Sequence, residues 1–171
     1  MTETNWAGSH AYSAARLHRP QSLAELSALV AGAERVHALG SRHSFNLVAD
    51  TPGDLVSTSG LPRDIEIDRD AGLVRVAGGV LYGDLATELH RQGWALASMA
   101  SLPHISVAGA VATGTHGSGD RVGSLASAVA AVECVGADGE TQSVARGDTD
   151  FEGWVVAVGA LGVVTHVTAC R

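Results

Sequence analysis

Lysine is absent from the sequence, and all 11 basic residues are arginine. Without lysine, the chain cannot use the P-loop lysine that binds nucleotide phosphates, and it cannot form a Schiff base with a carbonyl substrate. Its two cysteines, Cys134 and Cys170, are too few for a disulfide framework or a zinc site, and we expect both to be buried in strands. The N-terminus shows no secretory signal. These absences predict a cytoplasmic protein.

Other classes are excluded by charge and by missing motifs. The net charge of -7 argues against a nucleic-acid partner, which would require a basic surface. The longest apolar stretch, residues 154–164, is broken by glycines and too short to span a bilayer, so we expect no membrane partner. The chain lacks the Gly-x-Gly-x-x-Gly turn, the Gly-x-Ser-x-Gly elbow and the His-Glu-x-x-His zinc motif. We therefore also expect no bound metal.

The chain of 171 residues suits one domain or two small subdomains. Its residues are 46% hydrophobic but only 4% aromatic, so Ala, Val, Leu and Ile must build the core. We expect the three tryptophans, Trp6, Trp94 and Trp154, to pack in that core or between subdomains.

The hydrophobic pattern predicts a mixed α and β fold. Ser22 followed by Glu25 has capping-box spacing and begins a helix over residues 20–31. A subdomain boundary near Gly78–Gly79 fits the break before the next helix. The other predicted elements are helices over 81–92 and 148–157, strands over 35–39 and 161–168, and hairpins pairing 65–68 with 73–77 and 129–135 with 141–145.

Two segments rich in small residues stand out, residues 40–46 and residues 98–119. Glycine lets the backbone approach a ligand closely, and successive N–H groups form a concavity that binds pyrophosphate. Two such segments could hold one dinucleotide from both sides. Tight turns and close helix packing produce the same pattern, so the local features leave both interpretations open.

These segments resemble a known family. Gly-Ser-Arg-His-Ser-Phe-Asn at 40–46 and Met-Ala-Ser-Leu-Pro-His-Ile-Ser-Val-Ala-Gly at 99–109 resemble the alditol oxidases and, more broadly, the vanillyl-alcohol oxidase superfamily. Residues 5–8, 112–119 and 159–165 continue the resemblance along most of the chain. It implies an α+β fold: a p-cresol methylhydroxylase-type FAD-binding domain over residues 1–171. Two α/β subdomains, 1–78 and 79–171, would hold FAD between them.

The resemblance implies covalent FAD. In that family the histidine of the first segment is bonded to the 8α-methyl carbon of the flavin, and His43 holds that position here. A neutral imidazole nitrogen is a suitable nucleophile for this bond. The alternative is a solvent-facing loop histidine. Family members often carry glycine immediately before this histidine, whereas this chain has Arg42, which would contact phosphate or point to solvent.

Further FAD contacts follow from the same resemblance. Ser101 matches the family serine near the flavin ring and is the candidate catalytic residue. Helix capping is the alternative role for Ser106 and Thr113, and a buried structural histidine is the alternative for His104 and His116. The candidate cofactor-binding residues are Ala38, Leu39, Gly40, Ser41, Arg42, His43, Ser44, Ser101, Ser106, Gly109, Thr113, Gly114, Thr115, His116 and Val164.

The implied activity is oxidation of a polyol (alditol) carbon by hydride transfer to flavin N5, with O₂ reduced to hydrogen peroxide. The family's substrate base and polyol clamp lie mainly in a C-terminal domain. We expect that domain to be absent from this chain and the chain alone to be inactive. Two alternatives stay open: a sugar-1,4-lactone oxidase or dehydrogenase of the same superfamily, and a non-catalytic FAD-binding module.

Overall fold

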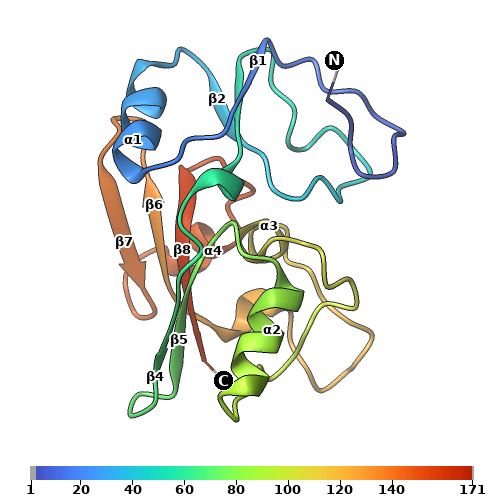
Figure 1. The fold of residues 1–171 in the computed structure, drawn as a ribbon, viewed down its shortest axis with the longest axis vertical. Helices are drawn as coiled ribbons and strands as arrows, with labels where there is room; N and C mark the ends of the chain where they lie inside the picture. The colour runs from blue at the N-terminus through green and yellow to red at the C-terminus, as the bar shows by residue number, and fades with distance from the viewer. Residues whose placement is uncertain (1–2, 171) are drawn as a thin grey trace.

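Two β-sheets organise the chain in the computed structural model, which describes residues 3–170. In chain order the elements are β1 (Arg16–His18), α1 (Leu23–Gly32), β2 (Val36–Ala38), β3 (Asp54–Val56), η1 (Thr58–Gly60), β4 (Ile65–Asp68), β5 (Leu73–Ala77), α2 (Tyr82–Arg91), α3 (Val107–Ala112), η2 (Leu125–Ala128), β6 (Val129–Val135), β7 (Thr141–Ala145), α4 (Phe151–Val155) and β8 (Val163–Cys170). The first sheet has three parallel strands in the order β1-β3-β2, and the second has five antiparallel strands in the order β4-β5-β8-β6-β7. Figure 1 shows the smaller sheet and α1 at one end of the molecule and the larger sheet at the other. The mixed α+β fold is confirmed.

Helix α1 confirms the capping signal. The Ser22 hydroxyl accepts a hydrogen bond from the Glu25 N–H (3.2 Å), which satisfies one of the free donors of the first turn. Leu26 and Val30 on this helix are buried. They pack in one apolar cluster with Val56 of the first sheet and with Val135 and Val163 of the second. The helix therefore joins the two sheets.

Both predicted hairpins are confirmed. β4 pairs with β5, and β6 pairs with β7, each antiparallel. One face of the larger sheet is apolar: Val76 and Val167 from its strands pack with Leu85 and Leu89 of α2 in the main core. Figure 1 shows α2 and α3 on this side of the sheet.

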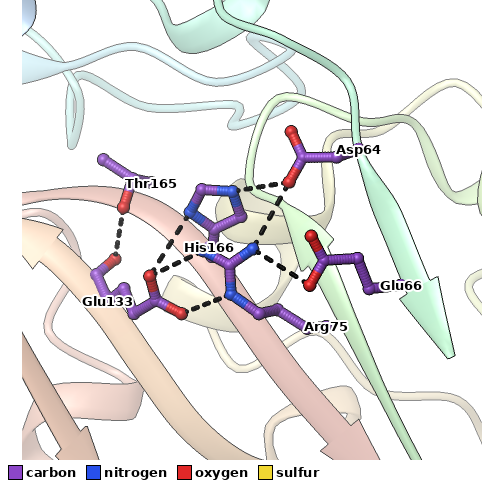
Figure 2. Close-up of polar contacts among 6 residues, drawn as sticks. All are labelled: Asp64, Glu66, Arg75, Glu133, Thr165 and His166. Carbon is purple, nitrogen blue, oxygen red and sulfur yellow. Dashed lines mark hydrogen bonds and ion pairs between the residues drawn. The ribbon is translucent and has the colours of Figure 1, made fainter. Parts of the chain in front are cut away.

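Polar side chains occupy a different part of the larger sheet. Arg75 forms two hydrogen bonds to the Glu133 carboxylate (2.6 and 2.8 Å) and lies 3.5 Å from Glu66. His166 Nε2 lies 3.0 Å from the Asp64 carboxylate, which also accepts from Arg75 at 3.4 Å. Figure 2 shows how these residues of β4, β5, β6 and β8, with Asp64 just before β4, converge. We call these five residues the Arg75 network.

Five elements were not predicted: β1, β3, α3 and the short 3-10 helices η1 and η2. β1 and β3 have three residues each, too few to show the alternation that identifies a strand. α3 lies inside the segment of residues 98–119 that is rich in small residues, for which no helix was predicted. Its buried residues Val107, Ala110 and Val111 have helical spacing, but the neighbouring alanines and glycine hide that period in the sequence.

The chain passes from the first sheet to the second between Val56 and Ile65. This change lies before the predicted boundary at Gly78–Gly79, since β4 and β5 pair within the larger sheet. The division into subdomains 1–78 and 79–171 stays a prediction.

The tryptophan and cysteine predictions hold in part. Trp94 is buried, as predicted, and Trp154 is half-buried. Trp6 is 58% exposed, so the expectation that it packs in the core is wrong. Cys134 is buried, whereas Cys170 is exposed because β8 ends there.

Candidate functional site

The loop after β2 forms one side of a cavity. The Leu39 N–H donates to the Val56 carbonyl (2.7 Å), and the chain leaves the sheet at Gly40. Arg42 then adopts φ 65°, in the left-handed region that favours glycine. After this turn, His43 and Ser44 line the cavity.

The beginning of α3 forms the opposite side. The Ser106 N–H donates to the Ser41 hydroxyl across 3.1 Å, which ties the helix to the loop. A Cβ atom at Gly40 would lie 2.9 Å from Ser106 Oγ, and one at Gly109 would lie 2.7 Å from it. Only glycine permits this approach. The two segments rich in small residues are therefore in contact.

The cavity has a volume of about 280 Å³, close to the lower end of the range for small-molecule sites. β2, the loop after it, α3 and β8 all contribute to its walls. We call it the His43 cavity. The predicted cofactor residues that line it are Ala38, Leu39, Gly40, Ser41, Arg42, His43, Ser44, Ser106, Gly109, Thr113, Thr115 and Val164.

The remaining predicted residues lie elsewhere. Ser101 and His116 are exposed and line a neighbouring cavity of about 300 Å³. Thr115 lines both cavities, so the two adjoin. Gly114 is not among the lining residues of either cavity; its φ of 63° gives a backbone reason for glycine there.

Polar atoms in the His43 cavity lack partners. Tyr12 Oη, Ser106 Oγ and both ring nitrogens of His43 are buried without a hydrogen bond to any residue within 3–170. The backbone N–H groups of residues 40–44 also donate no hydrogen bond within that range. A buried polar group left unpaired costs about 1–3 kcal/mol. A polar ligand would satisfy these groups.

His43 lies beside two other rings. Its ring centroid is 4.7 Å from that of Trp6, with which it stacks, and 4.5 Å from that of His104. Partial burial, reinforced by His104 and Arg42, lowers the pKa of His43 below its ordinary value. The imidazole is therefore neutral at physiological pH, and the lone pair of one ring nitrogen is free to form a bond.

The structure excludes the buried structural role as the explanation for two histidines. His104 is exposed and touches the rings of His43 and Trp6, so it is not a buried structural histidine. His116 is exposed as well, and its Nδ1 lies 3.0 Å from the Gly117 carbonyl oxygen.

Some cavity residues were missed by sequence reasoning. Tyr12 lies far from both segments in the sequence, and no motif marks it. His37 and Gly159 also line the cavity, and a Cβ atom at Gly159 would lie 2.9 Å from the His37 ring. Val158 beside them has φ 54°, a conformation that β-branched residues rarely adopt, so the backbone is constrained there.

Metal and membrane features were also sought in the described part of the chain. Residues 3–170 contain no group of three or more His, Cys, Asp or Glu side chains that could hold a metal ion. None of their helices combines the length and the apolar character that crossing a bilayer requires.

Sequence comparisons show which known proteins this chain is similar to. The sequence model of the family described as "FAD binding domain" matches residues 14–145. Among curated proteins, the chain is 49% identical over 168 residues to an alditol oxidase of Streptomyces sp. (strain IKD472 / FERM P-14339), covering 96% of this chain and 40% of that protein.

Two further relatives carry lactone names. The chain is 37% identical over 169 residues to an L-gulono-1,4-lactone dehydrogenase of Mycobacterium tuberculosis (strain ATCC 25618 / H37Rv) and 30% identical over 171 residues to an L-gulonolactone oxidase of Mus musculus. Each alignment covers 96% of this chain and 39% of the relative. The chain thus spans about two fifths of the length of these relatives.

Proposed function

Because the chain belongs to the FAD binding domain family, we propose that it carries the FAD of an oxidoreductase that oxidises the hydroxyl-bearing carbon of a polyol. In this proposal FAD lies in the His43 cavity, between subdomains 1–78 and 79–171, and is covalently attached through His43. A cytoplasmic location is part of the same proposal and rests on the sequence.

One observation carries the proposal: the row of unpaired donors in the His43 cavity. The N–H groups of residues 40–44 donate no hydrogen bond within residues 3–170, and the Tyr12 and Ser106 hydroxyls in the same cavity are likewise unpaired. Successive free N–H groups suit an anionic diphosphate, and hydroxyls suit ribose and ring polar atoms. The residues present therefore fit a dinucleotide such as FAD.

The chain's own residues bind and orient the cofactor, which when bound supplies the electron acceptor for the oxidation. Gly40 and Gly109 keep the loop and α3 close enough to form one wall. Ser101, on the adjoining cavity, is proposed to lie near the flavin ring and to position the substrate hydroxyl. A serine hydroxyl needs an activating neighbour to act as a base, so Ser101 is assigned positioning rather than proton removal.

Covalent attachment is supported by the state of His43. Its lowered pKa keeps the imidazole neutral, and both nitrogens are free of hydrogen bonds to residues 3–170. Stacking against Trp6 limits rotation of the ring. A neutral, oriented and unpaired imidazole has the properties that a nucleophile needs.

Two substrate classes compete. A polyol with O₂ as acceptor is favoured by the higher identity to the alditol oxidase, 49% against 37% for the lactone dehydrogenase. Oxidation of a sugar lactone is the second candidate, because several relatives carry lactone names.

The test uses the intact purified protein. Its absorbance spectrum should show a bound flavin, and xylitol or sorbitol should yield hydrogen peroxide in air. Gulono-1,4-lactone serves as the competing substrate, and a redox dye under nitrogen as the competing acceptor. Turnover of lactone without turnover of polyol would reverse the substrate assignment, and a protein without flavin would refute the FAD proposal.

A further inference from the structure

Residues 3–10 hold the His43 loop from outside the cavity. The Trp6 N–H donates to the Arg42 carbonyl (2.8 Å), Asn5 Nδ2 donates to the Ser44 carbonyl (3.1 Å), and His10 Nε2 lies 2.8 Å from the Phe45 carbonyl. These three hydrogen bonds hold the loop through its backbone carbonyl groups. We call residues 3–10 the N-terminal clamp.

The Arg42 side chain adds an ion pair with Glu3 to this clamp, and we call the Glu3–Arg42 pair the latch. Its guanidinium pairs with the Glu3 carboxylate and donates to the Thr4 carbonyl (3.2 Å). The Arg42 side chain thus reaches the clamp and stays 38% exposed. The phosphate contact raised from the sequence stays a prediction.

The loop needs this support on two grounds. Arg42 has φ 65°, a conformation that glycine adopts freely and that other residues disfavour because of their Cβ atom. On the clamp side, a cavity of about 540 Å³ borders Glu3, Trp6 and the loop residues 39–43. Since side chains do not fill that space, the clamp contacts are what keep the loop in place there.

We propose that the Glu3–Arg42 pair is a positioning device that holds His43 in the geometry needed for covalent attachment of the flavin, replacing the conformational freedom that glycine at position 42 would supply. This inference rests on the proposed function. Attachment would form one N–C bond and break one C–H bond of the flavin methyl group and one N–H bond of the His43 imidazole. The two electrons and two protons released would reduce O₂ to hydrogen peroxide.

A double-mutant cycle tests the proposal. The intact protein, produced without flavin in riboflavin-depleted cells, is incubated with saturating FAD, and the covalent fraction is followed by in-gel flavin fluorescence after denaturation. The variants are Glu3→Gln, Arg42→Gly and their combination, with Glu34→Gln as a matched charge control on the exposed surface. Total bound flavin before denaturation is measured in parallel.

Glu3→Gln should slow attachment by roughly fivefold to tenfold while residue 42 is arginine, because the left-handed state is then less populated. In the Arg42→Gly background the same change should alter the rate by less than about twofold, since glycine needs no latch. Glu3→Gln should leave total bound flavin unchanged in either background, because Glu3 does not line the His43 cavity, and this separates positioning from binding.

Equal slowing by Glu3→Gln in both backgrounds, or no slowing in either, would overturn the latch while leaving covalent FAD intact. Wild-type protein that binds FAD but never attaches it would overturn both the latch and the covalent part of the proposed function. Slowing by Glu34→Gln equal to that by Glu3→Gln would show a general charge effect and also overturn the latch.

Discussion

The Arg75 network and the His43 cavity treat their polar groups in opposite ways. In the network, each charged group has an oppositely charged partner from another part of the chain, as Figure 2 shows for Arg75 and Glu133. In the cavity, Tyr12 and Ser106 are buried with no partner within residues 3–170. The carboxylates and the guanidinium of the network are thus all paired, although His166 Nδ1 has no hydrogen bond within residues 3–170, whereas the cavity leaves several polar atoms free for a ligand.

The energetic consequence of this contrast is direct. Hydrogen bonds to charged groups contribute about 1.5–3 kcal/mol each, so the network stabilises the larger sheet. Unpaired buried groups cost a similar amount, so the cavity lowers the stability of the protein without ligand. We infer that the larger sheet is the framework and that the His43 cavity is reserved for the cofactor. The predictions below are arranged to separate the two roles.

The largest expected effect is on flavin attachment. His43→Ala should abolish covalent flavin completely while keeping noncovalent FAD, because the backbone donors of residues 40–44 remain. In-gel fluorescence of acid-denatured protein measures the covalent part. His90→Ala is the matched histidine control, since His90 is exposed on α2 and lines neither cavity. Covalent flavin surviving His43→Ala would contradict the assignment.

A methyl group at the loop–helix contact should also have a large effect. Gly109→Ala would place Cβ 2.7 Å from Ser106 Oγ and displace this hydroxyl, which lines the His43 cavity, so FAD affinity should fall by roughly tenfold or more. Gly153→Ala is the control, because a Cβ atom there meets nothing within 4 Å. Fluorescence titration with FAD gives both affinities, and equal values would refute the close-contact role of Gly109.

Disrupting the network should change stability but not cofactor binding. Glu133→Gln removes the charge that Arg75 binds through two hydrogen bonds, and unfolding free energy should fall by about 1.5–3 kcal/mol. Urea denaturation of the protein without flavin measures it. FAD affinity should stay within about twofold of the wild type. A large loss of FAD affinity with unchanged stability would contradict the division of roles.

A smaller effect is expected from Tyr12→Phe. The variant removes a buried hydroxyl that has no partner within residues 3–170, so the protein without flavin should be at least as stable as the wild type. FAD binding should weaken by about 0.5–1.5 kcal/mol, or roughly twofold to tenfold. Thermal unfolding and FAD titration of the same samples test both. A loss of stability with unchanged affinity would show that the hydroxyl serves the fold.

The smallest effect concerns pH. The hydrogen bond from Arg75 lowers the pKa of Glu133, against the opposing effect of burial. A carboxylate with a lowered pKa in the folded state contributes stability above its unfolded pKa, and this contribution is lost as pH falls through the folded pKa. Stability should therefore decrease below about pH 4.5, and less steeply in Glu133→Gln. Identical slopes of unfolding free energy against pH would contradict this role.

The same contrast explains what the sequence could predict. The strands of the larger sheet were predictable because alternation and turn residues act locally, as in the hairpin of residues 65–68 and 73–77. The loop at 40–46 was predictable from its small residues and from the family resemblance. Helix α3 was missed because a six-residue helix of small side chains has no visible period.

Some residues of the site could not be predicted, because only the folded chain brings them close to the others. Tyr12 reaches the cavity only because the fold brings its segment against Leu39 and Leu55, so no local pattern marks it. Arg42 was recognised as a departure from the family, but its pairing with Glu3 joins residues 39 positions apart. Contacts of this kind depend on the path of the whole chain.

The account's central claim is that the His43 cavity holds FAD bonded to His43. The most direct measurement is mass spectrometry of proteolytic peptides from the intact protein, after production with sufficient riboflavin. We predict that the peptide containing His43 carries the added mass of the flavin, with fragment ions placing it on the imidazole. Unmodified His43 peptide from a protein that nonetheless contains flavin, or flavin mass on any other residue, would contradict the claim.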